Sequence, residues 1–165
     1  MQGNGENEIR IRRLKNNIDI SGQAIMLFGA WGVIKALLML YFDPTMNDMI
    51  RSGTEDYNEF ERRIFFVLFT SVIVVILVLI FLFYYMIGKG AVRYARGEKK
   101  SARFIVPAAV LLVFEVATLP GFFTDKVANT LDASVWSLLV ELGTCFMLFD
   151  MIYSYYAIKR ISKKM

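Results

Sequence analysis

The sequence predicts an all-α integral membrane protein, a bundle of four transmembrane helices with both the N and C termini in the cytoplasm. Hydrophobic residues make up 56% of the 165 residues, and the mean hydropathy is +0.48. Soluble domains are usually less apolar than this. The apolar residues are also gathered into four segments long enough to cross a hydrocarbon core, which takes about 20 residues of helix.

These four segments are the predicted spans of a single membrane domain over residues 1–165. The second contains no charged residue, and the other three have the length and the flanking segments of a span. The first is expected to remain as an anchor, because its apolar run exceeds the roughly 7–15 residues typical of a cleaved signal peptide. The predicted spans cover residues 24–42, 64–87, 104–123 and 133–158.

The basic residues of the polar segments predict the orientation, since Lys and Arg concentrate on the cytoplasmic side. Of the 19 Lys and Arg residues, fourteen fall in the two tails and the second connection, and four fall in the other two connections. We therefore expect a multi-pass protein of the plasma membrane or the bacterial inner membrane. The predicted cytoplasmic segments are residues 1–23, 88–103 and 159–165, and the predicted outer loops are residues 43–63 and 124–132.

Two further features belong to the predicted cytoplasmic face. Residues 8–20 space Ile and Leu roughly as a helix does, so either a helix on the membrane surface or a solvated tail fits them. Tyrosines at the ends of the second and fourth spans are expected at the membrane interface. They are Tyr84, Tyr85, Tyr153, Tyr155 and Tyr156.

The composition argues against most enzymes. The chain has no histidine and a single cysteine, Cys145, so histidine or thiolate metal clusters, an intramolecular disulfide and Cys–His catalysis are excluded. No Gly-rich phosphate loop or Ser–His pair is present. We expect no enzymatic activity, catalytic residue, metal or cofactor. The net charge of +4 is attributed to topology and not to nucleic-acid binding.

Ionisable residues inside the predicted spans point to a functional site. Each costs roughly 2.5–3.5 kcal/mol at a span centre and therefore needs a partner or a purpose. Lys35, Glu115 and Glu141 lie 7 or 8 residues from the outer ends of their spans, at a depth of about 11 Å. Thr70 and Ser71 lie 6 and 7 residues from the outer end of the second span. All four spans are thus expected to contribute to one polar layer.

Hydroxyl groups extend the predicted layer along two of the spans. In the fourth span, the polar residues that recur at helical spacing on one face are Ser134, Ser137, Glu141, Thr144 and Cys145. In the third span, Thr118 follows Glu115 by about one helical turn.

Two interpretations of the layer remain open. Lys35 can neutralise one of Glu115 and Glu141, and the other is expected to bind a proton, a cation or a cationic ligand, because an isolated carboxylate is unfavourable in a low dielectric. This describes a cation-sensitive cavity in the outer half of the bundle. The alternative is a Lys–Glu pair beside a protonated glutamate, both of which serve only to set the packing of the helices.

Asp150 is predicted to form a second, inner acidic site. It lies nine residues after Glu141, hence about half a turn round the helix, and about 12 Å from the cytoplasmic end of its span. A contact that only packs helices or subunits together is equally compatible with its position. The expected partners are Arg103, Lys89, or the hydroxyl of Tyr84 or Tyr85.

Small residues in the first span predict a close approach to another helix. Gly22, Gly29 and Ala36 repeat every seven positions, which allows two backbones to pack together. The apolar second span is expected to face lipid or another subunit.

Two functional classes follow from these observations. The first is a proton- or cation-coupled transporter or channel-like component of unidentified substrate. The second is a non-transporting membrane subunit, assembly factor, sensor or immunity-type protein that acts by binding a partner. The lipid bilayer is the expected surrounding in both classes, and a homo-oligomer or another membrane protein is the expected partner.

Overall fold

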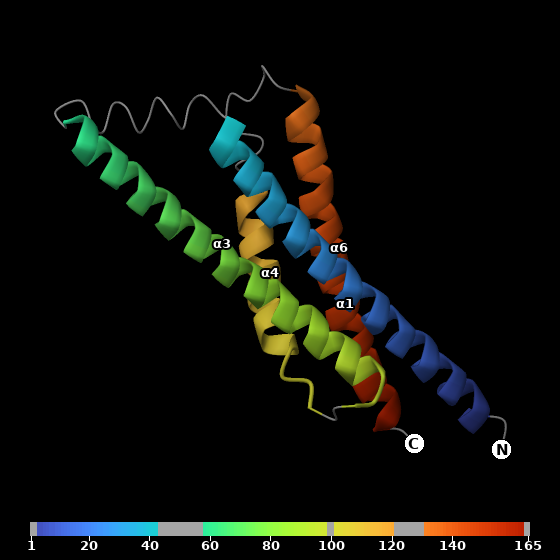
Figure 1. The fold of residues 1–165 in the computed structure, drawn as a ribbon. Helices are drawn as coiled ribbons and strands as arrows, with labels where there is room; N and C mark the ends of the chain where they lie inside the picture. Colours follow the sequence, from blue (N-terminus) through green and yellow to red (C-terminus); the bar gives the residue numbers. More distant parts are fainter. Residues whose placement is uncertain (1–2, 43–57, 99–100, 121–130, 164–165) are drawn as a thin grey trace. The chain divides into compact units, whose positions relative to one another are not determined.

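The computed structural model describes residues 3–42, 58–98, 101–120 and 131–163 and is helical throughout most of these ranges (Figure 1). Within them it contains four helices and no strand, so the predicted all-α class is confirmed. Three of the helices contain stretches long and apolar enough to cross a membrane, Gly5–Leu40, Glu59–Ala95 and Ser137–Ser162. This supports a membrane location for the chain. The helices are α1 (Gly3–Phe42), α3 (Glu59–Ala95), α4 (Ile105–Thr118) and α6 (Leu131–Ser162).

Helix α1 begins well before the predicted first span. Residues 8–20 are helical and continue without interruption into the apolar residues of the predicted span. The sequence leaves two alternatives open for them, a surface helix and a solvated tail. The Glu, Arg, Lys and Leu residues of this segment have high helix propensity, and it contains no proline. The Gln23 side chain also donates a hydrogen bond to Asp19 Oδ2, one turn away, over 3.0 Å.

Helix α3 extends the predicted second span at both ends. At its start, the Asn58 N–H donates to Glu61 Oε2 over 3.0 Å, which satisfies a backbone donor that has no partner within the helix. At its end, Gly97 adopts a φ of +79°. There the Gly97 and Glu98 N–H groups donate to the carbonyls of Tyr94 and Arg93 over 3.1 and 3.0 Å. This is a Schellman cap, and its left-handed residue favours glycine.

Helix α4 is shorter than the span predicted over residues 104–123. Its 14 residues extend for about 21 Å, whereas a hydrocarbon core is about 30 Å thick. Pro107 lies in the first turn, where an N–H has no helical partner in any case. Pro120, just after the helix, has no N–H with which to continue it. Residues 121–123 of the predicted span lie outside the described residues.

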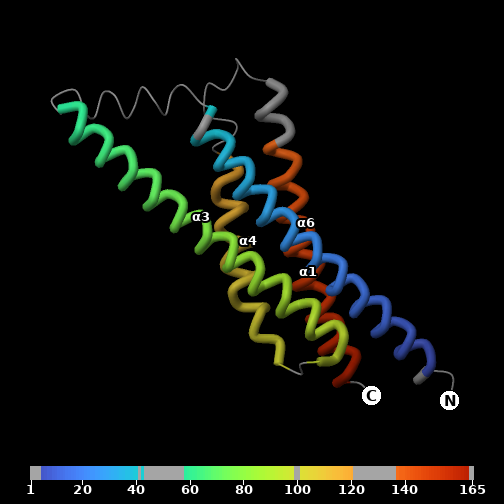
Figure 2. Tube along the Cα trace, in the orientation of Figure 1, coloured from blue at the N-terminus to red at the C-terminus, as the bar shows by residue number. Residues whose placement is uncertain are grey.

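The chain divides into two compact units, and Figure 2 follows the trace through both. The first unit comprises Met1–Phe28 and Tyr84–Met165, which hold the start of α1, the end of α3, α4 and α6. The second comprises Gly29–Phe83, which holds the rest of α1 and α3.

The first unit contains the described core of the protein. Buried residues recur every three or four positions on each helix, as expected for helices that pack through one face, and α4 packs against α6. Aromatic rings of Tyr94, Phe104 and Tyr155 meet at one end, with centroids 5.6–6.5 Å apart. The buried apolar residues are Ile18, Ile25, Ile87, Ala91, Phe104, Ile105, Ala108, Leu111, Leu148, Met151 and Ile158.

Helices α1 and α3 approach each other closely at Gly22 and Gly88 within the first unit. A β-carbon at Gly22 would lie 2.9 Å from the Gly88 carbonyl oxygen, which is closer than real β-carbons approach. A β-carbon at Gly88 would collide with the Gly22 carbonyl and with Met26. The close approach predicted from the small residues of the first span is therefore confirmed at Gly22.

The second unit exposes apolar side chains along both of its helical segments. Trp31 and Leu38 of α1 and Val67 and Leu79 of α3 are each at least half exposed. Apolar surface of this kind is suited to lipid, and a contact with lipid or with another subunit remains the prediction for this part of the chain.

Candidate functional site

Glu115 occupies a core position of α4. It continues the buried stripe formed by Ile105, Ala108 and Leu111, and only 8% of its surface is exposed. The spacing of this stripe directs all four side chains to one side of the helix, toward the packed interior. A carboxyl group therefore stands where the helix pattern would otherwise place an apolar side chain.

A tyrosine hydroxyl supplies a hydrogen-bond partner of this carboxyl group. The hydroxyl of Tyr84 on α3 donates to Glu115 Oε1. The sequence predicts Tyr84 at the membrane interface, because it lies near the end of the predicted second span. Helix α3 continues for eleven residues beyond Tyr84 to Ala95. Tyr84 is half-buried, and its location at the membrane interface stays a prediction.

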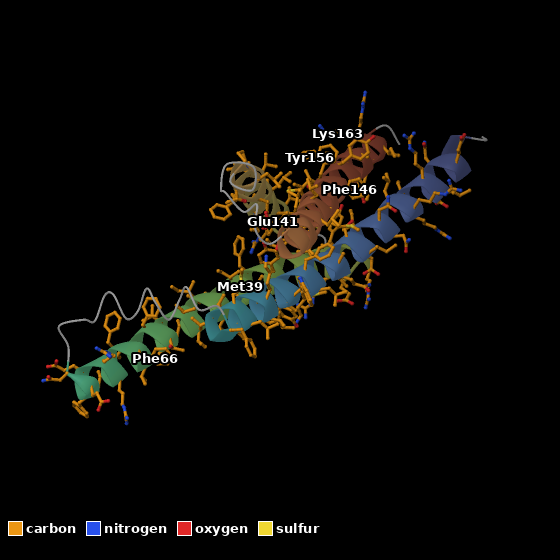
Figure 3. The ribbon with its side chains drawn as sticks, turned by 90° about the horizontal axis from the view of Figure 1, so that it is seen from above. Met39, Phe66, Glu141, Phe146, Tyr156 and Lys163 are labelled. Carbon is orange, nitrogen blue, oxygen red and sulfur yellow. The ribbon has the colours of Figure 1, made fainter. Side chains whose placement is uncertain are left out.

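Glu141 on α6 brings a second carboxyl group to the same region. Glu115 and Glu141 both lie close enough to Tyr84 and to the Cys145 thiol to act on them electrostatically. Glu141 and Cys145 are half-buried and are separated by one turn of α6, and Figure 3 shows Glu141 on this helix. Three helices, α3, α4 and α6, thus contribute to a polar cluster in the first unit. We call Tyr84, Glu115, Glu141 and Cys145 the carboxyl cluster.

The threonines predicted to join this site donate to their own helices. Thr144 is buried, with 3% of its surface exposed, and its hydroxyl donates to the Val140 carbonyl over 2.9 Å. Thr118 is exposed and donates to the Glu115 carbonyl over 2.8 Å. Such bonds to the preceding turn are common for threonine in helices, and they leave each hydroxyl oxygen only its acceptor capacity. Ser137 is half-buried on α6.

The remaining members of the predicted layer belong to the second unit. Lys35 on α1 and Thr70 on α3 are half-buried, whereas Ser71 is exposed and donates to the Val67 carbonyl over 2.7 Å. The layer that joins these residues to the two glutamates, with Lys35 as their counterion, stays a prediction.

Asp150 forms a separate polar contact within the first unit. The hydroxyl of Ser21 on α1, which is 1% exposed, donates to Asp150 Oδ2 over 3.3 Å. Ser154, one turn further along α6, is fully buried, and its hydroxyl has no hydrogen-bond partner among the described residues. Asp150 thus lies at the contact between α1 and α6.

Three of the four partners expected for Asp150 make other hydrogen bonds. Lys89 donates to the Tyr85 hydroxyl over 2.9 Å, and the Tyr84 hydroxyl donates to Glu115. Arg103 is exposed. The partner that the structure provides, Ser21, follows from the α1 stripe of Ile18, Ser21 and Ile25, whose spacing of three and four residues marks one buried helix face.

Sequence reasoning missed Tyr84 as a member of the carboxyl cluster, whereas it placed Cys145 on the same polar stripe of the fourth span as Glu141. Cys145 is four residues after Glu141, which was a usable signal. Tyr84 gave no such signal, because its contact with Glu115 depends on how α3 packs against α4. Among the residues that the structure describes, no group of three or more His, Cys, Asp or Glu side chains has the arrangement of a metal site.

Comparisons with family models, with curated proteins and with solved structures find no match to this chain.

Proposed function

We propose that this chain is a proton- or cation-coupled membrane transporter, or a channel-like component of one, whose carboxyl cluster binds the coupling ion. The observation that supports this function is the burial of Glu115 beside Tyr84 with the Glu141 carboxyl group nearby. In this function, the three apolar stretches Gly5–Leu40, Glu59–Ala95 and Ser137–Ser162 span the membrane.

The carboxyl cluster brings two carboxyl groups, those of Glu115 and Glu141, into the same packed region. Two carboxylates in a low-dielectric interior repel each other, and each also loses its hydration. One exchangeable proton or a bound monovalent cation compensates one of the two negative charges. Intramembrane carboxyl groups of this kind commonly mark ion pathways and proton relays.

Tyr84 has a positioning role in this proposal. Its hydroxyl donates to one oxygen of Glu115 and so limits the rotation of that carboxyl group. Tyr84 lies on α3 and Glu141 on α6, so that a shift of either helix relative to α4 changes the surroundings of Glu115. Binding of the ion is thereby linked to helix packing.

Ion movement is tested in liposomes that contain the purified full-length chain and a pH-sensitive dye. A potassium diffusion potential drives protons inward, and the rate of internal acidification is measured for the wild type, Glu115→Gln and Glu141→Gln. Each Gln substitution keeps the side-chain shape but removes the exchangeable charge. We expect both variants to lower the protein-dependent rate by about tenfold or more, as for a loss of roughly 1.4 kcal/mol or more.

Glu98→Gln is the matched control, because Glu98 is exposed and lies outside the carboxyl cluster. Its Oε2 atom lies 3.8 Å from Arg93 Nε. This variant is expected to retain the wild-type rate. If the coupling ion is sodium or potassium instead of a proton, Glu115→Gln and Glu141→Gln are expected to lower the flux of that ion. Absence of flux in the wild type, together with a loss of stability in Glu115→Gln, would favour the partner-binding class instead.

A further inference from the structure

The start of α1 and the end of α6 form a groove of about 410 Å³ in the first unit. It is distinct from the carboxyl cluster, because Tyr156 in its lining follows Glu141 by 15 residues, or about 22 Å of helix. Figure 3 labels both residues on α6. The polar residues that line the groove are Asn7, Arg10, Tyr153, Tyr156 and Arg160.

The lining of this groove is cationic. It contains two guanidinium groups, those of Arg10 and Arg160, and no carboxylate. Across the described ranges, neither arginine lies within ion-pair distance of an acidic side chain. By contrast, Arg96 Nε lies 3.4 Å from Asp19 Oδ1. Guanidinium groups bind phosphate oxygens through paired N–H donors. The groove therefore has the donors for a phosphate group, and the hydroxyls of its tyrosines and the Asn7 amide add to them.

One exposed face of α6 connects this cationic groove to an apolar surface. Phe146, Phe149, Tyr153, Tyr156 and Arg160 follow one another at intervals of three or four residues, and all five are exposed. The Phe149 and Tyr153 rings stack, with centroids 6.4 Å apart. Along this face the side chains change from hydrocarbon, through amphipathic tyrosines, to a cation. That order matches a phospholipid from its acyl chains to its phosphate.

We propose that this groove binds the phosphate group of an anionic phospholipid, whose acyl chains lie along the exposed face of α6 at Phe149 and Phe146. The volume of about 410 Å³ is in the range of small-molecule sites. The proposal requires only that α6 lies in a membrane, and it is independent of ion binding at the carboxyl cluster.

Native mass spectrometry of the full chain in detergent provides the test, with phosphatidylglycerol as the titrated lipid. The Arg10→Gln/Arg160→Gln double variant is compared with Arg12→Gln/Lys163→Gln, which removes the same charge from exposed residues that do not line the groove. We expect the first double variant to bind phosphatidylglycerol at least about tenfold more weakly, because it loses two charge-assisted contacts. The second is expected to bind as the wild type does, and phosphatidylcholine is expected to bind weakly to all three.

Further arms separate lipid binding in this groove from diffuse charge attraction and from binding of a free anion. Tyr153→Phe/Tyr156→Phe keeps the charge and the rings, and we expect it to weaken phosphatidylglycerol binding by several-fold even if the arginine variant does not fold. Equal weakening by the two charge variants would show diffuse attraction and overturn the proposal. Displacement of the lipid by inorganic phosphate in modest molar excess would assign the groove to a free anion and overturn the lipid assignment. Equal affinity for phosphatidylcholine would likewise refute the preference for anionic lipid.

Discussion

The hydroxyl of Tyr84 illustrates how one hydrogen bond contributes to the surroundings of a buried carboxyl group. Glu115 on α4 is 8% exposed and accepts a hydrogen bond from this hydroxyl, which belongs to α3. A buried acceptor that loses its donor costs about 1–3 kcal/mol, and more if it is charged. The same interaction therefore contributes both to the free energy of unfolding and to the position of the carboxyl group.

We expect Tyr84→Phe to lower the free energy of unfolding in detergent by about 1–3 kcal/mol. The ring still fills its space, so the loss reports the hydroxyl alone. Denaturant titration followed by circular dichroism measures the change.

Tyr85→Phe is the adjacent control for this measurement. Its hydroxyl accepts a hydrogen bond from Lys89 at an exposed position, so its removal is expected to change the free energy of unfolding by at most about 0.5 kcal/mol. An equal loss in both variants would contradict the role assigned to Tyr84.

At the scale of the elements, the contact of α1 with α3 in the first unit depends on two residues without side chains. The Gly22 and Gly88 backbones pack so closely that a β-carbon on either would collide with the other helix. Close backbone approach of this kind brings many atoms into van der Waals contact, which is the main source of helix association in lipid.

Gly22→Leu is therefore expected to destabilise the chain by about 1–3 kcal/mol or more, since the extra volume forces the helices apart. Thermal unfolding in detergent measures this loss. Gly32→Leu is the matched control on the same helix, because a β-carbon there meets nothing within 4 Å. If the two variants lose equal stability, the contact of α1 with α3 does not explain the loss, and helix propensity does not explain it either, because Leu has a higher helix propensity than Gly.

At the scale of the whole molecule, the distribution of basic residues predicts the orientation in the membrane. Two positions on either side of the predicted second span allow a test. Glu59, at the start of α3, lies in a predicted outer loop, and Ser101, six residues after the end of α3, lies in a predicted cytoplasmic connection. Single cysteines are introduced at each position in a Cys145→Ala background.

A membrane-impermeant maleimide is expected to label Glu59→Cys on intact cells, but Ser101→Cys only after permeabilisation. This follows because Lys and Arg are retained on the cytoplasmic side during insertion. Labelling of Ser101→Cys on intact cells would reverse the orientation assigned to both termini.

The sequence by itself determined the helical class and the approximate positions of the apolar helices. These properties depend on local composition and on the length of apolar runs, both of which can be counted along the chain. The ends of the helices were less predictable. Polar residues at both ends of α3 form part of the helix, whereas α4 ends at Thr118 before Pro120. Hydropathy measures where a helix is apolar, and not where its hydrogen bonds stop.

The contacts of the polar residues required the tertiary structure. Glu115 and Glu141 were identified from the rarity of charge within apolar segments. Their relation to Tyr84, and the contact of Asp150 with Ser21, depend on how far each helix extends and how it is turned against its neighbours. The cationic groove likewise combines residues from near the two ends of the chain. Residue spacing specifies a face of one helix, but only packing specifies which faces meet.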